Sequence, residues 1–267
     1  MTRFSIIIPT WKNIDYLDLA CRSIEKNSAA DHEVIVFFNE FDAACERWLG
    51  DRDVLHASSP ENVGVCAAVN RASELMTTDY LCFLNDDMYV LPGWDTALEA
   101  YLGIADKLWL SGTAVEAGKA TACYIGGHDY GSSPRNFDEE RLLAEYESLK
   151  RPYDVVSTWT PTLLSRKSWR DIDGFDEAYF PGNGSDPDLA MKMYEYGCRY
   201  FIGVGKSLVY HFSRRTISRF DDSRRDVMDP KAYFKKKWGM SRKKFLNKIL
   251  RRDQVIPAGF LENVRRT

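Results

Sequence analysis

Three short polar side chains follow an apolar stretch without a break near residue 85. Asn85–Asp87 comes directly after Tyr80–Leu84, which has the composition of a buried strand. Carboxylates at the carboxyl end of a strand lie where open α/β sheets bind their ligands. Their hard oxygen atoms suit Mg²⁺ or Mn²⁺, and these ions bridge the phosphates of a bound nucleotide. The pattern therefore predicts a metal and diphosphate site, with an Asx-type turn as the alternative.

The elements that would position these residues alternate along the first part of the chain. β-branched apolar stretches predict strands, and apolar residues at helical spacing predict helices. The predicted order is a strand at 4–10, a helix at 15–24 with Asp15 as its cap, a strand at 33–38, a helix at 43–49, a short strand at 54–56, a helix at 62–76 and a strand at 80–84. This alternation is typical of a doubly wound α/β fold with a mostly parallel sheet.

The pattern is less regular after residue 94. The predicted elements are a strand at 108–112, a loop at 118–135, a helix at 139–149, a strand at 155–164, a short helix at 165–172, a helix at 186–196 and strands at 201–204 and 207–210. Gly197 is expected to end the helix before it. Trp159 is expected to form an apolar floor for a sugar ring or to belong to the core.

The size and composition are those of a globular protein. Of the 267 residues, 45% are hydrophobic and 28% are charged, which is ordinary for a chain with a substantial core. Six scattered cysteines without a CxxC spacing predict reduced core residues in a cytoplasmic protein. Neither a signal-peptide pattern nor ~18 consecutive apolar residues occurs. We therefore expect a soluble protein or one that is peripheral at a membrane.

Charge is unevenly distributed along the chain. The net charge is −3, yet residues 214–267 contain 17 Lys and Arg against 6 Asp and Glu. This asymmetry predicts a basic helical C-terminal extension at 214–267. One face of a helix in it would carry Phe245, Leu246, Ile249 and Leu250. Such a helix docks on its own acidic domain, lies on an anionic membrane or binds nucleic acid. We favour docking or membrane contact over nucleic-acid binding.

Five segments, in this order, resemble the inverting, nucleotide-sugar-dependent glycosyltransferases of family 2, which have the GT-A fold. They are Ser5–Thr10, Asn62–Asn70, Asn85–Asp87, Gly174–Leu189 and Val209–His211. They look like the family's first strand, its Asn-x-Gly motif, its DxD-type motif, its acceptor-side block and a strand that ends in His. The resemblance implies a GT-A domain at 1–213, with a nucleotide-sugar half at 1–94 and an acceptor half at 95–213.

The resemblance implies where a divalent ion, Mn²⁺ or Mg²⁺, would bind. Asp87 is the first choice for a direct ligand, and His211 is the second, since neutral imidazole suits Mn²⁺. Asn85 stands where many relatives carry the first Asp, so its amide would contact ribose or a metal-bound water. Asp86 is either an alternative ligand or the cap of the turn.

The resemblance also implies a general base. An acceptor hydroxyl is a poor nucleophile until a base removes its proton, and Asp186 lies where the family places that base. Asp188 is the alternative base. Both residues also fit a helix start, with Asp186 as N-cap and Asp188 as a first-turn acid. Ser185 stands where relatives carry an acidic residue.

By position, the residues expected to contact the nucleotide-sugar donor are Thr10, Asn39, Glu40, Asn62, Asn70 and Arg71, together with Asn85 and Asp86. Relatives usually have an acidic residue where this chain has Phe38, so Asn39 or Glu40 would make the polar contact with the nucleobase. Arg71 would contact a phosphate or carboxylate, or would be an exposed helix residue. The nucleotide and the sugar are not predicted.

These implications give one leading hypothesis and two alternatives. The first is a metal-dependent inverting glycosyltransferase that moves a sugar to a glycan, lipid-linked or other hydroxyl acceptor in glycan or polysaccharide synthesis. The departures at Phe38, Asn85 and Ser185 suggest instead an inactive nucleotide-binding module of the same fold. The basic extension suggests a nucleic-acid-modifying glycosyltransferase. A nucleotidyl transferase is not favoured because the chain has no GxxxxGK[ST] loop.

Overall fold

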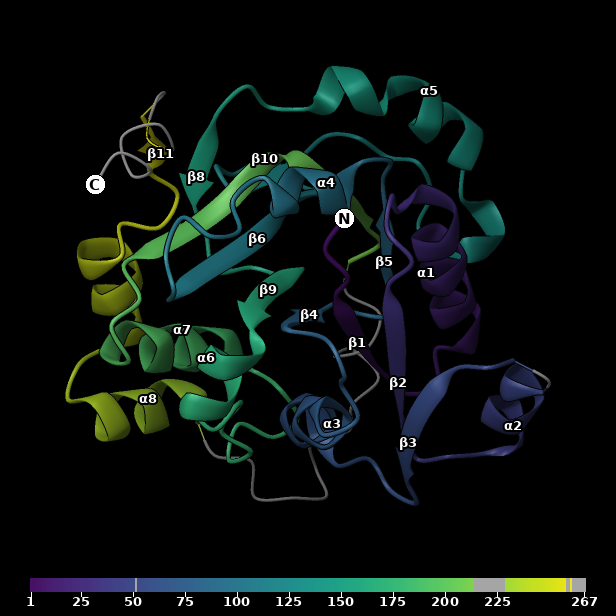
Figure 1. The fold of residues 1–267 in the computed structure, drawn as a ribbon, viewed down its shortest axis with the longest axis horizontal. Helices are drawn as coiled ribbons and strands as arrows, with labels where there is room; N and C mark the ends of the chain where they lie inside the picture. The colour runs from purple at the N-terminus through teal and green to yellow at the C-terminus, as the bar shows by residue number, and fades with distance from the viewer. Residues whose placement is uncertain (51, 214–228, 258–259, 261–267) are drawn as a thin grey trace.

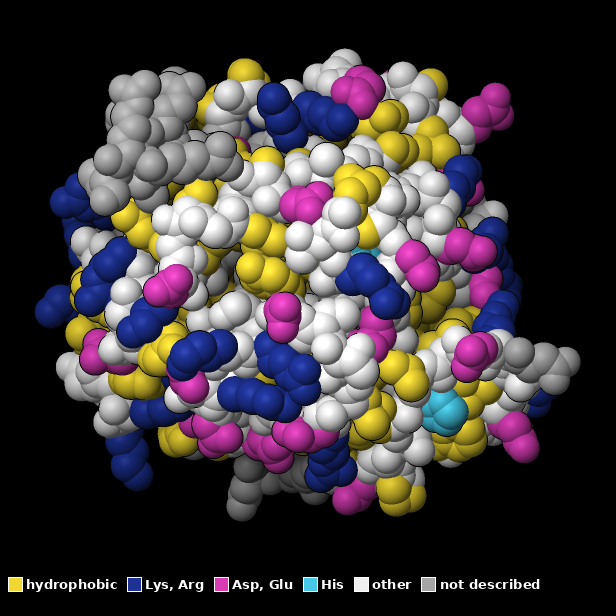
Figure 2. Space-filling view, in the orientation of Figure 1, with side chains coloured by type: hydrophobic (Ala, Val, Ile, Leu, Met, Phe, Trp, Pro, Cys, Tyr) yellow, Lys and Arg dark blue, Asp and Glu magenta, His cyan; other side chains and the backbone are white. Residues whose placement is uncertain are grey.

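The computed structural model describes residues 1–50, 52–213, 229–257 and 260 (Figure 1, Figure 2). Its strands are β1 (Ser5–Thr10), β2 (Glu33–Asn39), β3 (Leu55–Ser59), β4 (Tyr80–Phe83), β5 (Met88–Val90), β6 (Leu108–Val115), β7 (Tyr124–Ile125), β8 (Asp154–Val156), β9 (Thr162–Ser165), β10 (Tyr200–His211) and β11 (Val255–Ile256). They form one sheet in the order β11-β8-β10-β6-β9-β4-β1-β2-β3, with β5 paired to β10 and β7 to β6.

Helices cover both faces of this sheet (Figure 1). They are α1 (Ile14–Asn27), α2 (Ala43–Leu49), α3 (Gly64–Ser73), α4 (Trp94–Glu99), α5 (Glu139–Leu149), α6 (Arg166–Asp171), α7 (Ser185–Glu195), α8 (Pro230–Trp238) and α9 (Arg242–Lys244), with a 3₁₀ turn η1 (Pro134–Asn136) and a π-helical turn η4 (Phe245–Ile249). The predicted α/β fold class is confirmed. No helix in the described ranges is long and apolar enough to cross a membrane.

The first half of the sheet agrees with the sequence prediction. Strand β1 pairs in parallel with both β2 and β4, and β2 pairs in parallel with β3. Apolar side chains alternate between the two faces, as the pleat of a strand requires. Ile7 belongs to the core under α3, α6 and α7, whereas Ile6 and Ile8 belong to the core under α1, α2 and α4. The carboxyl ends of β1, β2 and β4 therefore meet at one edge.

The second half of the sheet is more antiparallel than predicted. Half of the ten strand pairings among the described residues are antiparallel, and all of these involve β5, β8, β9, β10 or β11. The single strand expected at 155–164 is two strands, because β8 pairs with β10 while β9 lies between β4 and β6. Pro161 cannot donate to a ladder and lies in the segment between them.

Other local predictions need correction. The two strands expected at 201–204 and 207–210 are one strand, β10, whose register shifts between Gly203 and Leu208. Strands β5 and β7 and helix α4 were not predicted, since two to six residues are too few to show a period. Asp15 lies inside the first turn of α1, and Asn13 is the N-cap residue. Helix α5 has the predicted bounds.

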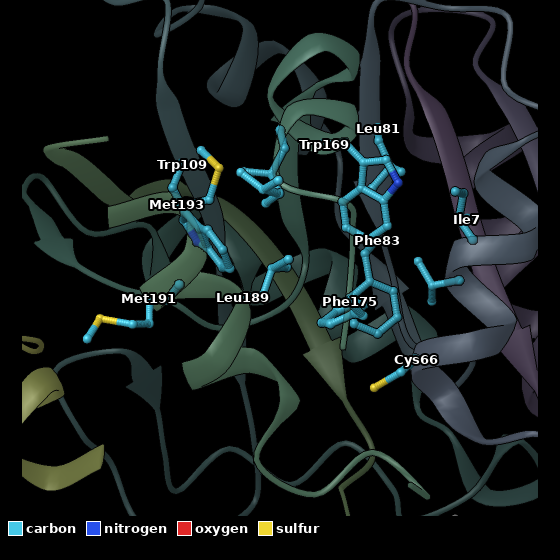
Figure 3. Packing of buried hydrophobic residues seen from close by; sticks show 14 of the residues in the cluster. Ile7, Cys66, Leu81, Phe83, Trp109, Trp169, Phe175, Leu189, Met191 and Met193 are labelled. Carbon is cyan, nitrogen blue, oxygen red and sulfur yellow. The ribbon is translucent and has the colours of Figure 1, made fainter. Parts of the chain in front are cut away.

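The described part of the basic extension packs onto the rest of the protein. Phe234 and Phe245 are completely buried, in the same core cluster as α3, α6 and α7. Figure 3 shows a central part of this cluster, where Phe83, Phe175 and Trp169 pack together. Strand β11 also pairs with β8 and extends the sheet. Of the predicted roles of the extension, docking onto its own domain is therefore the one that fits residues 229–257. Residues 214–228, 258–259 and 261–267 of the predicted extension lie outside the described residues.

The six cysteines are all free thiols. Five of them are buried, and Cys21 is half-buried. Burial raises the pKa of Cys66 and of Cys198 to about 12, so these thiols are core side chains rather than nucleophiles. The prediction of reduced cysteines agrees with this arrangement.

Candidate active site

A cavity of about 240 Å³ opens at the carboxyl ends of β1 and β4. It lies where parallel strands of α/β sheets present their ligand sites. The predicted site residues that line it are Thr10, Asn39, Asn62, Asn85, Asp86, Asp87, Asp186 and His211. They come from six segments of the chain, so the tertiary structure brings most of the predicted site together.

Asp86 links the ends of two neighbouring strands. Its carboxylate is buried and accepts a hydrogen bond from Thr10 Oγ1 at 2.7 Å. Burial, followed by the charge of Asp87, raises the pKa of Asp86 to about 7, against hydrogen bonds from Thr10 and Asn13. Asp86 thus ties β1 to the turn after β4.

Asp87 and His211 lie side by side on the cavity wall. His211 Nε2 is 3.3 Å from Asp87 Oδ1, and His211 Nδ1 is 2.7 Å from Glu116 Oε1. Burial by itself would lower the pKa of His211, but Asp87 and then Glu116 raise it to about 10. Two carboxylates therefore favour a positive charge at this point of the wall.

Glu116 is a site residue that the sequence analysis did not identify. It follows directly after β6, whose neighbour β10 ends in His211. The two strands are parallel, so their carboxyl ends meet. The predicted strand stopped at Gly112, and a strand drawn to Val115 would have placed Glu116 at the same edge as the other acids.

Asp186 also lines the cavity and lies in the first turn of α7. The N-cap residue of α7 is Gly184, so the N-cap interpretation of Asp186 is wrong. Burial raises the pKa of Asp186 to about 6, although Arg242 and Arg252 act in the opposite direction. A carboxylate with such a pKa is ionised at neutral pH and is a stronger base than an ordinary aspartate.

Comparison with known proteins decides the family of this chain. The family model described as "Glycosyl transferase family 2" matches residues 5–158, which is more than half of the 267 residues. The chain belongs to glycosyl transferase family 2. Two curated relatives, both named "Pre-mycofactocin glycosyltransferase" and from two strains of Mycobacterium tuberculosis, are 29% identical over 152 residues. The match covers 56% of this chain and 30% of each relative.

Solved glycosyltransferase structures share the fold. S. aureus TarS (residues 1–349) aligns with a TM-score of 0.52 at 13% identity, over 80% of this chain and 59% of that one. The mannosyltransferase PcManGT from Pyrobaculum calidifontis aligns with a TM-score of 0.54 at 16% identity, over 80% of this chain and 58% of that one. GalNAc-T7 aligns with a TM-score of 0.59 at 13% identity, over 79% of this chain and 44% of that one. This family 2 chain therefore has the GT-A fold, as the sequence resemblance implied.

Asp188, the alternative base in this family 2 chain, does not line the cavity. Its carboxylate is buried and accepts hydrogen bonds from Lys237 at 2.7 Å, Trp238 Nε1 at 2.6 Å and Tyr179 at 3.1 Å. Lys237 also donates to Asp176 at 2.7 Å. Asp188 therefore joins α7 to α8, and only Asp186 of the two candidates borders the cavity.

On the donor side of the family 2 site, two of the predicted residues hold the loop that leads into α3. Asn39 Oδ1 accepts a hydrogen bond from Val63 N at 3.0 Å, and Asn62 Oδ1 accepts one from Gly64 N at 2.9 Å. Glu40 lies outside the cavity lining. It pairs with Lys12 at 2.8 Å and accepts a hydrogen bond from Trp11 Nε1 at 2.8 Å. Trp11 itself lines the cavity, so Glu40 supports a wall residue.

Two predicted donor contacts lie away from the cavity. Asn70 donates to Phe175 O at 2.9 Å and accepts from Phe175 N at 2.9 Å, so its amide holds the start of the acceptor-side block. Arg71 is exposed on α3 and does not line the cavity. Phe38 packs in the core against Trp48, so an acid at its position would not reach the cavity.

Proposed function

We propose that this chain transfers a glycosyl group from a nucleotide-diphosphate sugar to an acceptor hydroxyl, with inversion and with help from a divalent ion. The observation that carries the proposal is that one cavity is lined by Asp87 and His211, which lie 3.3 Å apart, and by Asp186 from a different element, α7. Such an arrangement suits a reaction in which a diphosphate leaves on one side and a hydroxyl loses its proton on the other. Membership of glycosyl transferase family 2 supports it.

The donor set of the cavity fits Mn²⁺ or Mg²⁺ that is shared with the substrate. Asp87 and His211 would hold the ion, which would displace the proton that Asp87 and Glu116 favour on His211, and no three His, Cys, Asp or Glu side chains in the described ranges form a complete metal site of their own. The remaining ligands would be diphosphate oxygens and water. When bound, such an ion acts as a Lewis acid on the leaving diphosphate. The solved structures of PcManGT with GDP-Man and Mn²⁺ and of GalNAc-T7 with UDP, GalNAc and Mn²⁺ support this assignment.

Asp186 is the proposed general base. It would accept the proton of the acceptor hydroxyl while that oxygen attacks the anomeric carbon, and the bond to the nucleotide diphosphate breaks at the same carbon. One displacement on one face inverts the centre. Thr10, Asn39 and Asn62 line the same cavity as Asp186. We propose that they contact the nucleotide, and that the acceptor is a glycan, a lipid-linked molecule or another hydroxyl compound.

The test is a binding screen of UDP-, GDP-, dTDP- and CMP-sugars, with and without Mn²⁺, by thermal shift and calorimetry. Wild type should bind one nucleotide class in a metal-dependent way, and Asp87→Ala should lose that dependence. Asp79→Ala is the matched control, because Asp79 is exposed next to the other end of β4. It should bind like wild type.

The same screen separates the alternatives. Where a nucleotide sugar binds, an assay of donor hydrolysis with metal follows, and binding without hydrolysis would favour an inactive module. If no nucleotide binds with or without metal, the proposed function is wrong.

A further inference from the structure

Two arginines of the C-terminal segment are close enough to the proposed base for their charges to act on it. Arg242, the first residue of α9, approaches the start of α7 closely: a Cβ at Gly184 would lie 3.5 Å from Arg242 Nη1. Gly184 has a φ of +87° and is the N-cap residue of α7, two positions before Asp186. A glycine there admits both the left-handed backbone and the guanidinium above it.

Arg252 reaches the same side of the site from beyond η4. Its guanidinium lies 5.0 Å from the Trp159 ring, and Trp159 packs against Tyr124 at 5.3 Å. Trp159 precedes Thr160, which lines the cavity. The stack of Arg252, Trp159 and Tyr124 thus forms an aromatic and cationic wall near the cavity, on the side that holds Asp186.

Neither arginine is fully paired by the protein. Among the residues that the structure describes, no carboxylate lies within 4.0 Å of the Arg242 guanidinium. The Asp186 carboxylate is more than 4.0 Å from both arginines. Arg252 Nε is buried and has no hydrogen-bond partner, and Asp253 is 3.9 Å away with an exposed carboxylate. Lys237 is a contrast, since it donates to two carboxylates at 2.7 Å. Half-buried guanidinium groups with free donors are ready to bind an oxyanion.

The position of these charges is unfavourable for catalysis without a ligand. Both arginines lower the pKa of Asp186, and a lower pKa weakens a general base. An anion bound between them and the cavity would offset their charge.

We propose that Arg242 and Arg252 form an oxyanion subsite for the acceptor, so that the acceptor carries a phosphate or carboxylate near the hydroxyl that receives the sugar. The apolar faces of Trp159 and Tyr124 would contact the carbon skeleton of the same molecule. This inference rests on the proposed function, since it names the class of acceptor for the same site.

The test uses the full chain with Mn²⁺ and the nucleotide found in the donor screen at saturation, so that small anions cannot occupy the diphosphate site. Glycerol 3-phosphate, glucuronate and glycerol are then titrated by calorimetry. Wild type should bind at least one of the two anions and not glycerol. Arg242→Ala and Arg252→Ala should each weaken that binding at least about tenfold, as expected for a lost charge-assisted hydrogen bond.

Lys243→Ala and Lys244→Ala are the matched controls, because they remove the same charge from exposed positions of α9. They should change the affinity less than about twofold. If Arg252→Ala does not fold, Arg252→Lys keeps the charge but loses the planar fork and should still weaken binding.

Three results would decide the matter. Binding of either anion that depends on the arginines supports the subsite and identifies its group. Absence of binding to wild type, or equal loss in the lysine variants, overturns it. Failure of the donor screen itself would instead show that the proposed function is wrong.

Discussion

The two walls of the cavity are built in different ways. The donor wall comes from adjacent parallel strands, with Thr10 after β1, Asn39 at the end of β2 and Asp86 after β4, and all three side chains are buried. The proposed acceptor wall comes from the first turn of α7, where Asp186 lines the cavity, and is backed by Trp159 and by Arg242 and Arg252 of the C-terminal segment, which lie outside the lining. One wall is local to a sheet edge, and the other joins segments that are far apart in sequence.

This difference indicates separate duties. A wall of buried, mutually hydrogen-bonded side chains holds one shape, which suits a nucleotide diphosphate that is common to many reactions. A wall assembled from a helix start and a terminal segment can vary without disturbing the sheet. We therefore expect substitutions on the donor wall to act on nucleotide binding, and substitutions on the acceptor wall to act on turnover and acceptor choice.

The largest expected effect is that of Asp186→Asn. Loss of the proposed base should lower kcat about 10²–10⁴-fold, while the dissociation constant of the donor stays within about twofold of wild type. Steady-state kinetics and calorimetry on the same preparations check both values. A similar loss of donor affinity would show that the two walls do not have separate functions. The control is Asp188→Asn, which should lower stability but should not remove the base.

The next effect concerns the joint between α7 and α8. Lys237→Ala leaves Asp176 and Asp188 without their shared cation in a region where the Lys237 side chain is only 22% exposed. Removing one partner of a buried ion pair costs about 3–5 kcal/mol. Urea unfolding should show this loss, whereas Lys236→Ala, at an exposed position of α8, should stay within about 0.5 kcal/mol of wild type. Equal stabilities would show that the joint is not a stabilising contact.

The same joint should make stability depend on pH. Burial opposes the charge of Asp176, but the hydrogen bond from Lys237 outweighs it and keeps the pKa of Asp176 below its ordinary value of 3.8. Burial also opposes the charge of Lys237, but Asp176 and Asp188 raise its pKa above 10.5. The contribution of this ion pair to the free energy of unfolding is therefore complete between pH 3.8 and pH 10.5. It is lost on acidification through the lowered pKa and on alkalinisation through the raised one. Unfolding curves of wild type and Lys237→Ala should converge at both extremes.

A smaller, graded effect is expected in the pH profile of transfer. Because the pKa of Asp186 is raised to about 6, its ionised fraction should fall about tenfold per pH unit well below that value. The rate kcat should follow this acidic limb, and the residual rate of Asp186→Asn should not show it. A limb that persists in the variant would assign the titration to another group.

The smallest effect compares two neighbours on the donor wall. Asn39→Ala should weaken donor binding, because it leaves Val63 N without its buried acceptor, at a cost of about 1–3 kcal/mol. Glu40→Ala removes only a half-exposed pair with Lys12 and one hydrogen bond to Trp11, so the change should be below about 1 kcal/mol. Calorimetric titration of the donor distinguishes them. The reverse order would restore Glu40 as the nucleobase contact.

The agreement between sequence and structure is unequal along the chain. Strands β1, β2 and β4 and helices α1, α2 and α3 follow from apolar periodicity, so the donor wall was largely predictable. The second half of the sheet was not, because β8 and β9 are three and four residues long and pair with partners distant in sequence. Sequence reasoning also named Asn70 and Arg71 as donor contacts, although neither lines the cavity.

The amino-acid sequence alone determined the α/β alternation, the family and the cluster Asn85–Asp87 at a strand end, because these depend on local periodicity and on short motifs. The tertiary structure decided which acids face the cavity. It paired Glu116 with His211, turned Asp188 toward Lys237 and placed Arg242 and Arg252 where their charges lower the pKa of Asp186. Interactions of this kind join residues from 49 to 95 positions apart, and only the packing of helices on the sheet determines where such segments meet.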